Sequence, residues 1–354
     1  MLKNFWYGCE FSSAVTSQPK QIVMLNQKFV LYRDSQGQVV ALKDQCSHRG
    51  AALSLGWVED GCIRCPYHGW KFQADGKCID IPANAPETPI PKKARIETYP
   101  VQEKYGYVWL FYGDLPEEER PPIPPFPEFE DPTFNQIFLE LKYQTHYTRC
   151  IENTLDSAHL AIVHAKSFGA GFRQDPRVPD YQVQEENWGI SAKIKYANFT
   201  KPQNIFKLFF SPSYTELNTK TTFYLPNITK VEVDFVRGKM INYAIHLPVD
   251  ENTTITKRIQ FRNVLKQQWA DSLFVKSLYK SLNEDRIVSE SQYPAVIPDS
   301  LSAEVHCPSD ALPLAYRKLR QKYLAMGWGL KSNNCQSNNF NSHLEQHSST
   351  LVVK

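Results

Sequence analysis

Two short cysteine–histidine pairs constrain the fold of this 354-residue chain more than any other feature. The first is Cys46-Ser47-His48, the second is Cys65-Pro66-Tyr67-His68, and residues 49–64 separate them. Each pair is short enough to occupy one tight turn, and Gly50 and Gly69 supply the backbone freedom that such turns use. The spacing therefore predicts two loops that face each other, each offering one sulfur and one nitrogen, on a rigid scaffold.

This ligand set fits a [2Fe-2S] cluster in which thiolates bind one iron and neutral imidazoles bind the other, which raises the reduction potential. Such a cluster is a one-electron relay. The alternative is zinc, because two cysteines and two histidines also satisfy tetrahedral Zn²⁺. Zinc fingers usually place both cysteines on one turn and both histidines on a helix. Here each half mixes sulfur with nitrogen, which favours the iron–sulfur cluster.

Composition limits the classes of protein that the chain can belong to. A hydrophobic content of 42% with 13% aromatic residues is ordinary for a globular protein. A net charge of +3 is too small to indicate nucleic-acid binding, and no apolar run reaches the length of a membrane span. The chain enters aromatic, strand-like sequence by Phe5 without an apolar leader, and eight cysteines do not form a disulfide scaffold. We therefore expect a cytoplasmic protein.

The pattern along the chain predicts an α+β protein with four segments. Residues 1–115 hold short β-rich runs broken by turn residues and are expected to form an all-β domain that carries the cluster. Residues 116–132 hold seven of the 24 prolines and are expected to form a linker. Residues 133–330 combine long alternating runs, typical of an antiparallel sheet, with a long helix near 264–292. Residues 331–354 are rich in Asn and Ser and are expected to be disordered.

A second candidate metal site begins in the predicted helical segment from Glu152 to His164. His159 and His164 are five residues apart, so on a regular helix their side chains point about 140° from each other. They converge on one ion only if the helix is distorted or ends near His164. Taken alone, the pair is weak evidence for a metal site, because two histidines in a helix of this length are more often unrelated.

A carboxylate in the long helix strengthens this site. Asp285 falls on the apolar face, where an ionised carboxylate is costly unless it meets a cation or strong donors. Glu284 is about 100° away and is expected on the polar side. A buried salt bridge to an arginine is the alternative for Asp285. Two histidines and one carboxylate form the facial triad of non-haem Fe(II) oxygenases. The apolar face comprises Phe274, Leu278, Leu282 and Val288 around Asp285, and the polar side Ser277, Lys280 and Glu284.

The cluster motif, the run from Glu152 to His164 and Asn283-Glu284-Asp285-Arg286 together resemble the Rieske non-haem iron oxygenases over most of the chain. The resemblance implies a Rieske β domain followed by a helix-grip catalytic domain, assembled head to tail as a homotrimer. It implies that Asp156 bridges the mononuclear iron of one subunit and the cluster of the next. It also implies Cys46, His48, Cys65 and His68 as cluster ligands, and His159, His164 and Asp285 as iron ligands.

The same resemblance implies an enzyme that uses dioxygen and electrons from a ferredoxin or an NAD(P)H-dependent reductase. The Asn153-x-x-Asp156-x-x-His159 spacing resembles members that hydroxylate or oxidatively demethylate a small cyclic substrate. Residues 304–310 and 314–319 resemble the hydroxylases of saxitoxin-type pathways. One alternative is another type of oxygenase, either a ring-dihydroxylating dioxygenase or a chlorophyllide or pheophorbide oxygenase. A second alternative is an electron-transfer protein without oxygenase activity. The basic run from Arg317 to Lys322 is expected either to dock an acidic ferredoxin or to be a solvated face.

Overall fold

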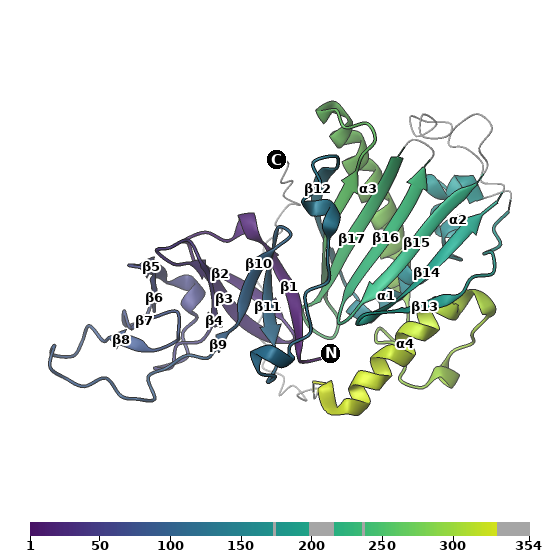
Figure 1. Cartoon of the computed structure of the whole chain (residues 1–354). Coiled ribbons are helices and arrows are strands. Elements are labelled where there is room, and N and C mark those ends of the chain that lie inside the picture. Colours follow the sequence, from purple (N-terminus) through teal and green to yellow (C-terminus); the bar gives the residue numbers. More distant parts are fainter. Residues whose placement is uncertain (173–174, 198–215, 236–237, 331–354) are drawn as a thin grey trace. The chain divides into compact units, whose positions relative to one another are not determined.

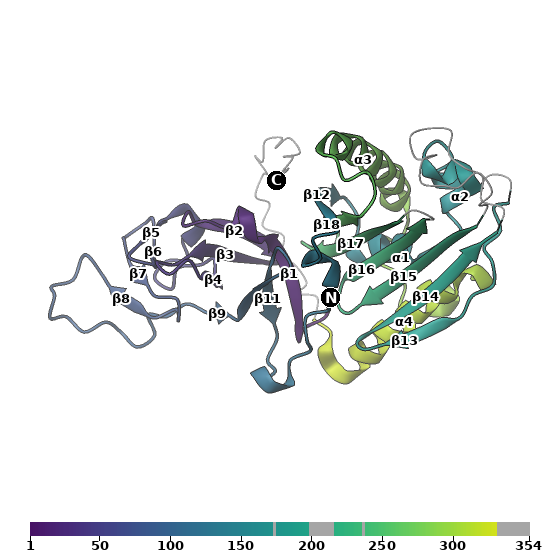
Figure 2. The ribbon, with the colours of Figure 1, turned by 45° about the horizontal axis from the view of Figure 1, so that its top comes forward.

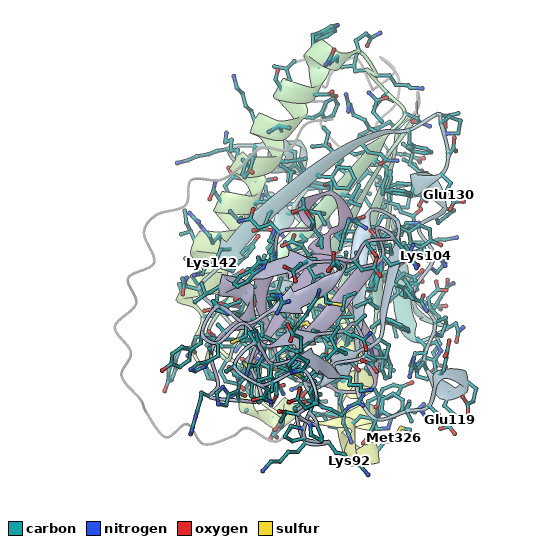
Figure 3. All side chains as sticks on the ribbon, turned by 90° about the vertical axis from the view of Figure 1, so that its left-hand side faces the viewer. Lys92, Lys104, Glu119, Glu130, Lys142 and Met326 are labelled. Carbon is teal, nitrogen blue, oxygen red and sulfur yellow. The ribbon has the colours of Figure 1, made fainter. Side chains whose placement is uncertain are left out.

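The computed structural model describes residues 1–172, 175–197, 216–235 and 238–330, and the chain divides into two compact units. The first unit contains Asn4–Ile123 and Leu247–Asp250, and the second contains the rest of the described chain (Figure 1). The division falls within the proline-rich segment 116–132. Short 3-10 turns occur there, and Figure 3 shows Glu119 and Glu130 extending outward from it. The tail expected to be disordered, residues 331–354, lies outside the described residues.

The first unit is built from β-strands and short turns, in three antiparallel sheets. Their orders are β1-β11-β10, β2-β3-β4-β9 and β5-β6-β7-β8. The strands are β1 (Phe5–Phe11), β2 (Lys20–Met24), β3 (Gln27–Arg33), β4 (Val39–Lys43), β5 (Trp57–Glu59), β6 (Cys62–Arg64), β7 (Lys71–Phe72), β8 (Cys78–Asp80), β9 (Thr98–Tyr99), β10 (Val101–Lys104) and β11 (Tyr107–Tyr112).

Side chains from two of these sheets form one buried core beneath the cysteine–histidine loops. Val30 and Leu42 come from the sheet of β3 and β4, and Ile63 and Phe72 come from the sheet of β6 and β7. The thiol of Cys65 lies in the same core, as does that of Cys46. The short loops are therefore anchored at their sulfur ends by apolar packing.

The second unit is dominated by a seven-stranded antiparallel sheet with the order β12-β18-β17-β16-β15-β14-β13 (Figure 1). The strands are β12 (Asn135–Tyr143), β13 (Val183–Glu186), β14 (Gly189–Tyr196), β15 (Leu217–Tyr224), β16 (Ile228–Phe235), β17 (Gly238–Pro248) and β18 (Thr254–Arg262). The helices are α1 (Tyr147–Leu155), α2 (Leu160–Val163), α3 (Gln268–Ser291) and α4 (Ala311–Tyr323).

The helices cover one face of this sheet. Phe274 of α3 shares a core with Leu139 of β12 and Ile194 of β14, and Figure 2 shows α3 beside the β12 and β18 end of the sheet. Tyr316 of α4 packs edge-on against Phe223 of β15, with ring centroids 4.7 Å apart. An all-β first domain followed by a long helix packed on an antiparallel sheet is the predicted fold class, which is confirmed.

The structure corrects two helix predictions. The segment predicted as one helix from Glu152 to His164 is two helices, α1 and α2, with an interruption at residues 156–159. The long helix begins at Gln268, four residues after the predicted Val264, and ends at Ser291. Among the described residues, no helix has the length and apolarity that crossing a bilayer requires.

Candidate functional site

The two cysteine–histidine loops have the same backbone hydrogen bonding. In the first, the Gly50 N–H donates to the Cys46 carbonyl (2.9 Å) and the Cys46 N–H donates to the Ala51 carbonyl (2.8 Å). In the second, the Gly69 N–H donates to the Cys65 carbonyl (3.0 Å) and the Cys65 N–H donates to the Trp70 carbonyl (2.9 Å). Both glycines have φ above +70°, a conformation that favours glycine. Each loop therefore closes on itself and presents its cysteine and histidine together.

The four predicted ligands are brought together with the sulfurs inside and the imidazoles outside. Cys46 and Cys65 are buried, whereas His48 is half-buried and His68 is exposed. The two imidazole rings lie 4.6 Å apart between centroids. Trp70 stacks on His48 at 4.4 Å with an interplanar angle of 4°, so its indole fixes the plane of that ring. The role of Trp70 was not predicted, although it follows the second motif directly.

The electrostatics of these loops fit a bound metal cluster. The Nδ1 atom of His48 is buried and has no hydrogen-bond partner, which leaves a nitrogen ready to coordinate. Burial, followed by the nearby His68 and Arg49 charges, lowers the pKa of His48, which favours the neutral ligand form. Burial raises the pKa of the Cys46 thiol to about 11, and a bound iron ion is the usual means of deprotonating such a thiol.

An arginine braces the second loop. Arg64 Nη1 donates to the Gly69 carbonyl at 2.7 Å, and the same guanidinium pairs with Glu59 and Asp80 at 2.6 and 2.8 Å. The loop is thus tied to β5 and β8, the two edge strands of its small sheet. This bracing supports the orientation of Cys65 and His68.

The interruption between α1 and α2 is what lets His159 and His164 meet. Asp156 ends α1 in an extended conformation, and its Oδ1 accepts the Ala158 N–H at 2.7 Å in a local turn. His159 is then the residue that begins α2, and His164 is the residue that ends it. Because the two histidines flank one helical turn, the 140° separation of a regular helix does not apply.

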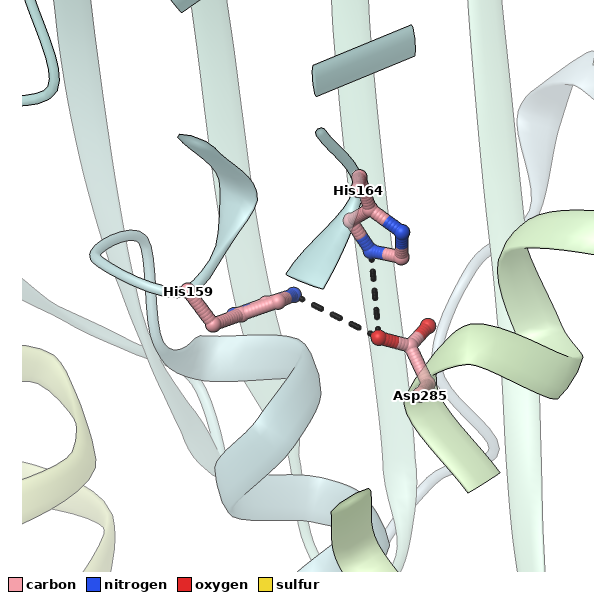
Figure 4. Close-up of side chains that lie close together, drawn as sticks. All are labelled: His159, His164 and Asp285. Carbon is pink, nitrogen blue, oxygen red and sulfur yellow. Dashed lines mark ion pairs between the residues drawn. The ribbon is translucent and has the colours of Figure 1, made fainter. Parts of the chain in front are cut away.

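His159, His164 and Asp285 point their polar atoms at one place (Figure 4). Their ligand atoms lie within 4.8 Å of one another. Asp285 Oδ1 is 3.1 Å from His164 Nε2 and 3.5 Å from His159 Nε2. Ligands around one ion with bonds of about 2.1 Å are separated by roughly 3.0–3.4 Å, so these residues fit a shared metal ion. The sequence argument for Asp285 on the buried face agrees with this position, but Val288, predicted on the same face, is 42% exposed.

Each residue of this triad has its own neighbouring polar group. Asp156 Oδ2 lies 3.4 Å from His159 Nδ1, and Asn153 Nδ2 lies 3.3 Å from Asp285 Oδ1. Glu284 corrects a prediction, because it does not lie on a solvated polar side. Its Oε2 is 2.8 Å from His164 Nδ1. The segment after α2 covers the face of α3 that helical periodicity alone assigned to solvent.

The two carboxylates beside His164 oppose the effect of burial. Burial lowers the pKa of His164, but hydrogen bonds to Asp285 and Glu284 raise it, and the net shift is upward. Such an imidazole surrounded by anionic oxygens is a strong position for a cation. For Asp156, burial raises the pKa, but the contacts with His159 and the Ala158 N–H lower it by more. The net shift is downward, so the Asp156 carboxylate stays ionised.

A pocket of about 300 Å³ opens beside Asp156 and His159, within the second unit. Two arginines and two glutamates form its buried wall: Arg317 Nη2 is 3.0 Å from Glu152 Oε2, and Arg149 Nη2 is 2.9 Å from Glu304 Oε1. This network corrects the interpretation of the basic run in α4. Arg317 and Arg320 are buried, so they are neither part of a solvated face nor available to a ferredoxin, whereas Lys318 and Lys322 are exposed.

Two family models match the chain. Residues 5–100 match the Rieske [2Fe-2S] domain, and residues 143–326 match the vanillate O-demethylase oxygenase C-terminal domain. The two matches include all the cysteines, histidines and carboxylates described above. They follow each other in the order that the sequence motifs predict.

Known proteins give the same result. The chain is 30% identical to a 4beta-methylsterol monooxygenase of Methylococcus capsulatus over 259 residues, 72% of this chain and 67% of that protein. It is 27% identical to the chloroplastic chlorophyllide a oxygenase of Chlamydomonas reinhardtii over 332 residues, 90% of this chain and 48% of that protein. NdmA of Pseudomonas putida CBB5, solved with caffeine, superposes with a TM-score of 0.76 at 25% identity, with 92% of each chain covered. The chain spans about half the length of the first curated relatives that it matches.

Proposed function

Because the chain belongs to the Rieske oxygenases with a C-terminal domain of the vanillate O-demethylase type, we propose that it is an oxygenase that hydroxylates or oxidatively demethylates a small cyclic organic substrate. The observation that carries this proposal is the convergence of His159, His164 and Asp285 in the second unit. An electron carrier needs only the cysteine–histidine loops. The second unit adds a two-histidine, one-carboxylate site, which is the ligand set of an oxygen-handling ferrous ion.

Two metal groups would be held by these residues. Cys46, His48, Cys65 and His68 would hold the [2Fe-2S] cluster, and His159, His164 and Asp285 would hold one Fe(II). When bound, the cluster supplies single electrons and the ferrous ion supplies the site at which dioxygen is used. His159 and His164 would contribute Nε2 atoms and Asp285 one oxygen, which would leave positions open for other molecules.

The protein's own groups control access and charge around the triad. Leu160 and Ala161 of α2 and Phe172 beyond it pack into the apolar core beside α3, which limits water near the site. Asn153 holds Asp285, and Asp156 and Glu284 hold the two histidines. Fixed donors and acceptors of this kind orient a reactive centre without reorganisation during the reaction.

We propose that Asp156 connects the mononuclear site to the cluster of an adjacent subunit in a head-to-tail homotrimer. Its carboxylate contacts His159 and also lines the 300 Å³ pocket, so it reaches from the site to the molecular surface. Val305, in the same pocket lining, is 99% exposed, as expected for an apolar residue that a partner covers. On the cluster side of this proposed contact, the exposed His68 of the adjacent subunit would face Asp156.

Relatives that act with oxygen on small molecules support the proposed type of substrate. The 4beta-methylsterol monooxygenase and the NdmA–caffeine complex both concern cyclic, methyl-bearing compounds. This supports mono-oxygenation or demethylation over ring dihydroxylation. The chlorophyllide a oxygenase keeps a tetrapyrrole as the alternative substrate class. A ferredoxin or an NAD(P)H-dependent reductase would supply the electrons.

The location remains the cytoplasm in this proposal. None of the seven cysteines in the described residues forms a disulfide, and reduced cysteines in a protein with an iron–sulfur cluster suit a reducing compartment.

Metal analysis with an active-site variant tests the function. Purified protein should contain three Fe per chain and give a Rieske-type EPR signal after reduction. Asp285→Ala should lose the third Fe and all substrate-dependent oxygen uptake while the EPR signal stays. Two Fe per chain in the wild type would indicate an electron carrier, and zinc without iron would indicate a structural metal protein; either result overturns the proposal.

A further inference from the structure

Among the described residues, Glu284 makes the shortest hydrogen bond to an imidazole ring of the triad. Its Oε2 lies 2.8 Å from His164 Nδ1 and also accepts a hydrogen bond from Ser167 Oγ at 2.6 Å. His164 is 2% exposed and Glu284 is 18% exposed at the side chain, so this contact is largely removed from water. One carboxylate oxygen therefore serves both a histidine ring and the segment that follows it.

The elements around this contact leave the ring little freedom. Gly169 packs so closely that a Cβ there would lie 2.7 Å from His164 Cβ and 2.0 Å from the Leu160 carbonyl oxygen. Phe168 lies beside the His164 ring, with centroids 4.4 Å apart. Lys280 of α3 donates to the Lys166 carbonyl. Two residues of α3, Lys280 and Glu284, thus form hydrogen bonds with the segment from His164 to Phe168.

We infer that Glu284 is a positioning residue, which fixes both the tautomer and the ring orientation of His164. This inference rests on the proposed mononuclear metal site. An ionised carboxylate only accepts hydrogen bonds, so Glu284 requires the proton of His164 to be on Nδ1. The lone pair is then on Nε2, the atom that faces Asp285 Oδ1 at 3.1 Å. A carboxylate that orients a metal-binding histidine in this way usually changes metal affinity by 10–100-fold.

The two histidines differ in how they are held, and the difference separates Glu284 from Asp156. Asp156 is at the end of α1, lines the open pocket and lies 3.4 Å from His159 Nδ1. Glu284 is inside α3, and its partners His164 and Ser167 both belong to the segment that packs on this helix. Asp156 can therefore connect the site to the outside, whereas Glu284 acts only on the geometry of His164.

The test measures metal binding and ligand geometry without relying on turnover. Wild type, Glu284→Ala, Glu284→Gln and Lys280→Met are depleted of metal at the mononuclear site and titrated with Fe(II) and, separately, with Co(II). The Co(II) d–d absorption reports the ligand arrangement. The Rieske-type EPR signal and the melting temperature check that each variant is folded.

We expect Glu284→Ala to bind Fe(II) about 10–100-fold more weakly and to give altered Co(II) bands. Glu284→Gln should recover much of the affinity and the wild-type bands, because its amide oxygen still accepts a hydrogen bond from Nδ1–H. Lys280→Met removes the other hydrogen bond from α3 to the same segment and should leave the Fe(II) affinity and the Co(II) bands unchanged. If Glu284→Ala does not fold, Glu284→Met, which removes the hydrogen-bond acceptor but keeps most of the side-chain volume, takes its place beside Glu284→Gln and Lys280→Met and should show the same loss.

Several results would overturn the inference. One is wild-type affinity and bands in Glu284→Ala. Another is equal loss in Lys280→Met, which would mean that Glu284 only holds the segment. A third is the absence of recovery in a folded Glu284→Gln. A wild type that binds no metal outside the cluster would instead overturn the proposed function itself, so the two failures are distinguishable.

Discussion

The side-chain amide of Asn153 donates to the same Asp285 oxygen that faces both His159 and His164. Asn153 Nδ2 lies 3.3 Å from Asp285 Oδ1, and that oxygen is 3.1 Å from His164 Nε2. The contact joins α1 to α3 at the point where the triad is assembled. Asn153 therefore restrains the Asp285 carboxylate, and replacing Asn153 should first reduce the retention of metal.

We predict that Asn153→Ala weakens Fe(II) binding at the mononuclear site by about tenfold or more, since a hydrogen bond to a charged group contributes roughly 1.5–3 kcal/mol. The measurement is the rate at which a ferrous chelator removes the third Fe. Thr154→Ala is the matched control, because Thr154 donates only to the Cys150 carbonyl within the same helix. Equal iron loss from both variants would show that α1 was merely destabilised.

Asp156 allows charge and local geometry to be separated. Asp156→Asn keeps the side-chain oxygen that accepts the Ala158 N–H and ends α1, but removes the carboxylate beside His159. We predict that both variants, Asp156→Asn and Asp156→Ala, retain three Fe per chain and a normal Rieske signal, yet lose at least 100-fold in substrate-dependent turnover. Stopped-flow reoxidation of the prereduced cluster, in the presence of substrate and dioxygen, measures the rate at which electrons leave the cluster.

An Asp156→Asn enzyme that reoxidises its cluster at the wild-type rate would remove Asp156 from the electron path. If only Asp156→Ala is slow, the loss would be attributed to the turn at residues 156–159 and not to the charge. Iron analysis on the same samples distinguishes both cases from simple loss of metal.

The cluster loops could be predicted from sequence because all their determinants are local. Cys46, His48 and Gly50 lie within five residues, and Cys65, His68 and Gly69 do likewise, so spacing alone specifies each turn. The long helix and the antiparallel sheet were also predictable, since their apolar periods are regular. The exact start of α3 was not, because the apolar residues Val264 and Leu265 precede the helix without adopting helical structure.

The rest depends on contacts between distant residues. Helical periodicity placed His159 and His164 far apart because it could not show that Asp156 ends α1. It placed Glu284 in solvent because the covering segment, His164 to Ser167, is more than 100 residues away. Charge counting made Arg317 an exposed cation, although its partner Glu152 is 165 positions earlier. In each case the missing information was which surface a second element covers.

The buried arginine of α4 provides a stability prediction. Arg317 is 5% exposed and pairs with Glu152 and Glu304. Breaking a buried ion pair by removing one partner leaves an uncompensated charge and costs about 3–5 kcal/mol. Arg317→Met should therefore lower the melting temperature by several degrees, whereas Lys318→Met, at an exposed position of the same helix, should change it little. Equal melting temperatures for the two variants would contradict the buried network.

His246 predicts how the second unit responds to acid. The residue is 2% exposed, with Nε2 and Nδ1 at 2.9 and 3.1 Å from the hydroxyls of Thr229 and Thr256. Burial, followed by the charge of Arg258, lowers the pKa of His246 from 6.5 to about 3. The folded state therefore keeps the ring neutral, while the unfolded chain binds a proton below pH 6.5. The contribution of the neutral His246 to the free energy of unfolding is complete above pH 6.5. It is lost progressively as the pH falls towards 3, at up to about 1.4 kcal/mol per pH unit.

We expect His246→Gln to have a lower melting temperature at pH 7 but a shallower fall in melting temperature between pH 6 and pH 4. Parallel curves for the two proteins over that range would show that His246 does not titrate on unfolding.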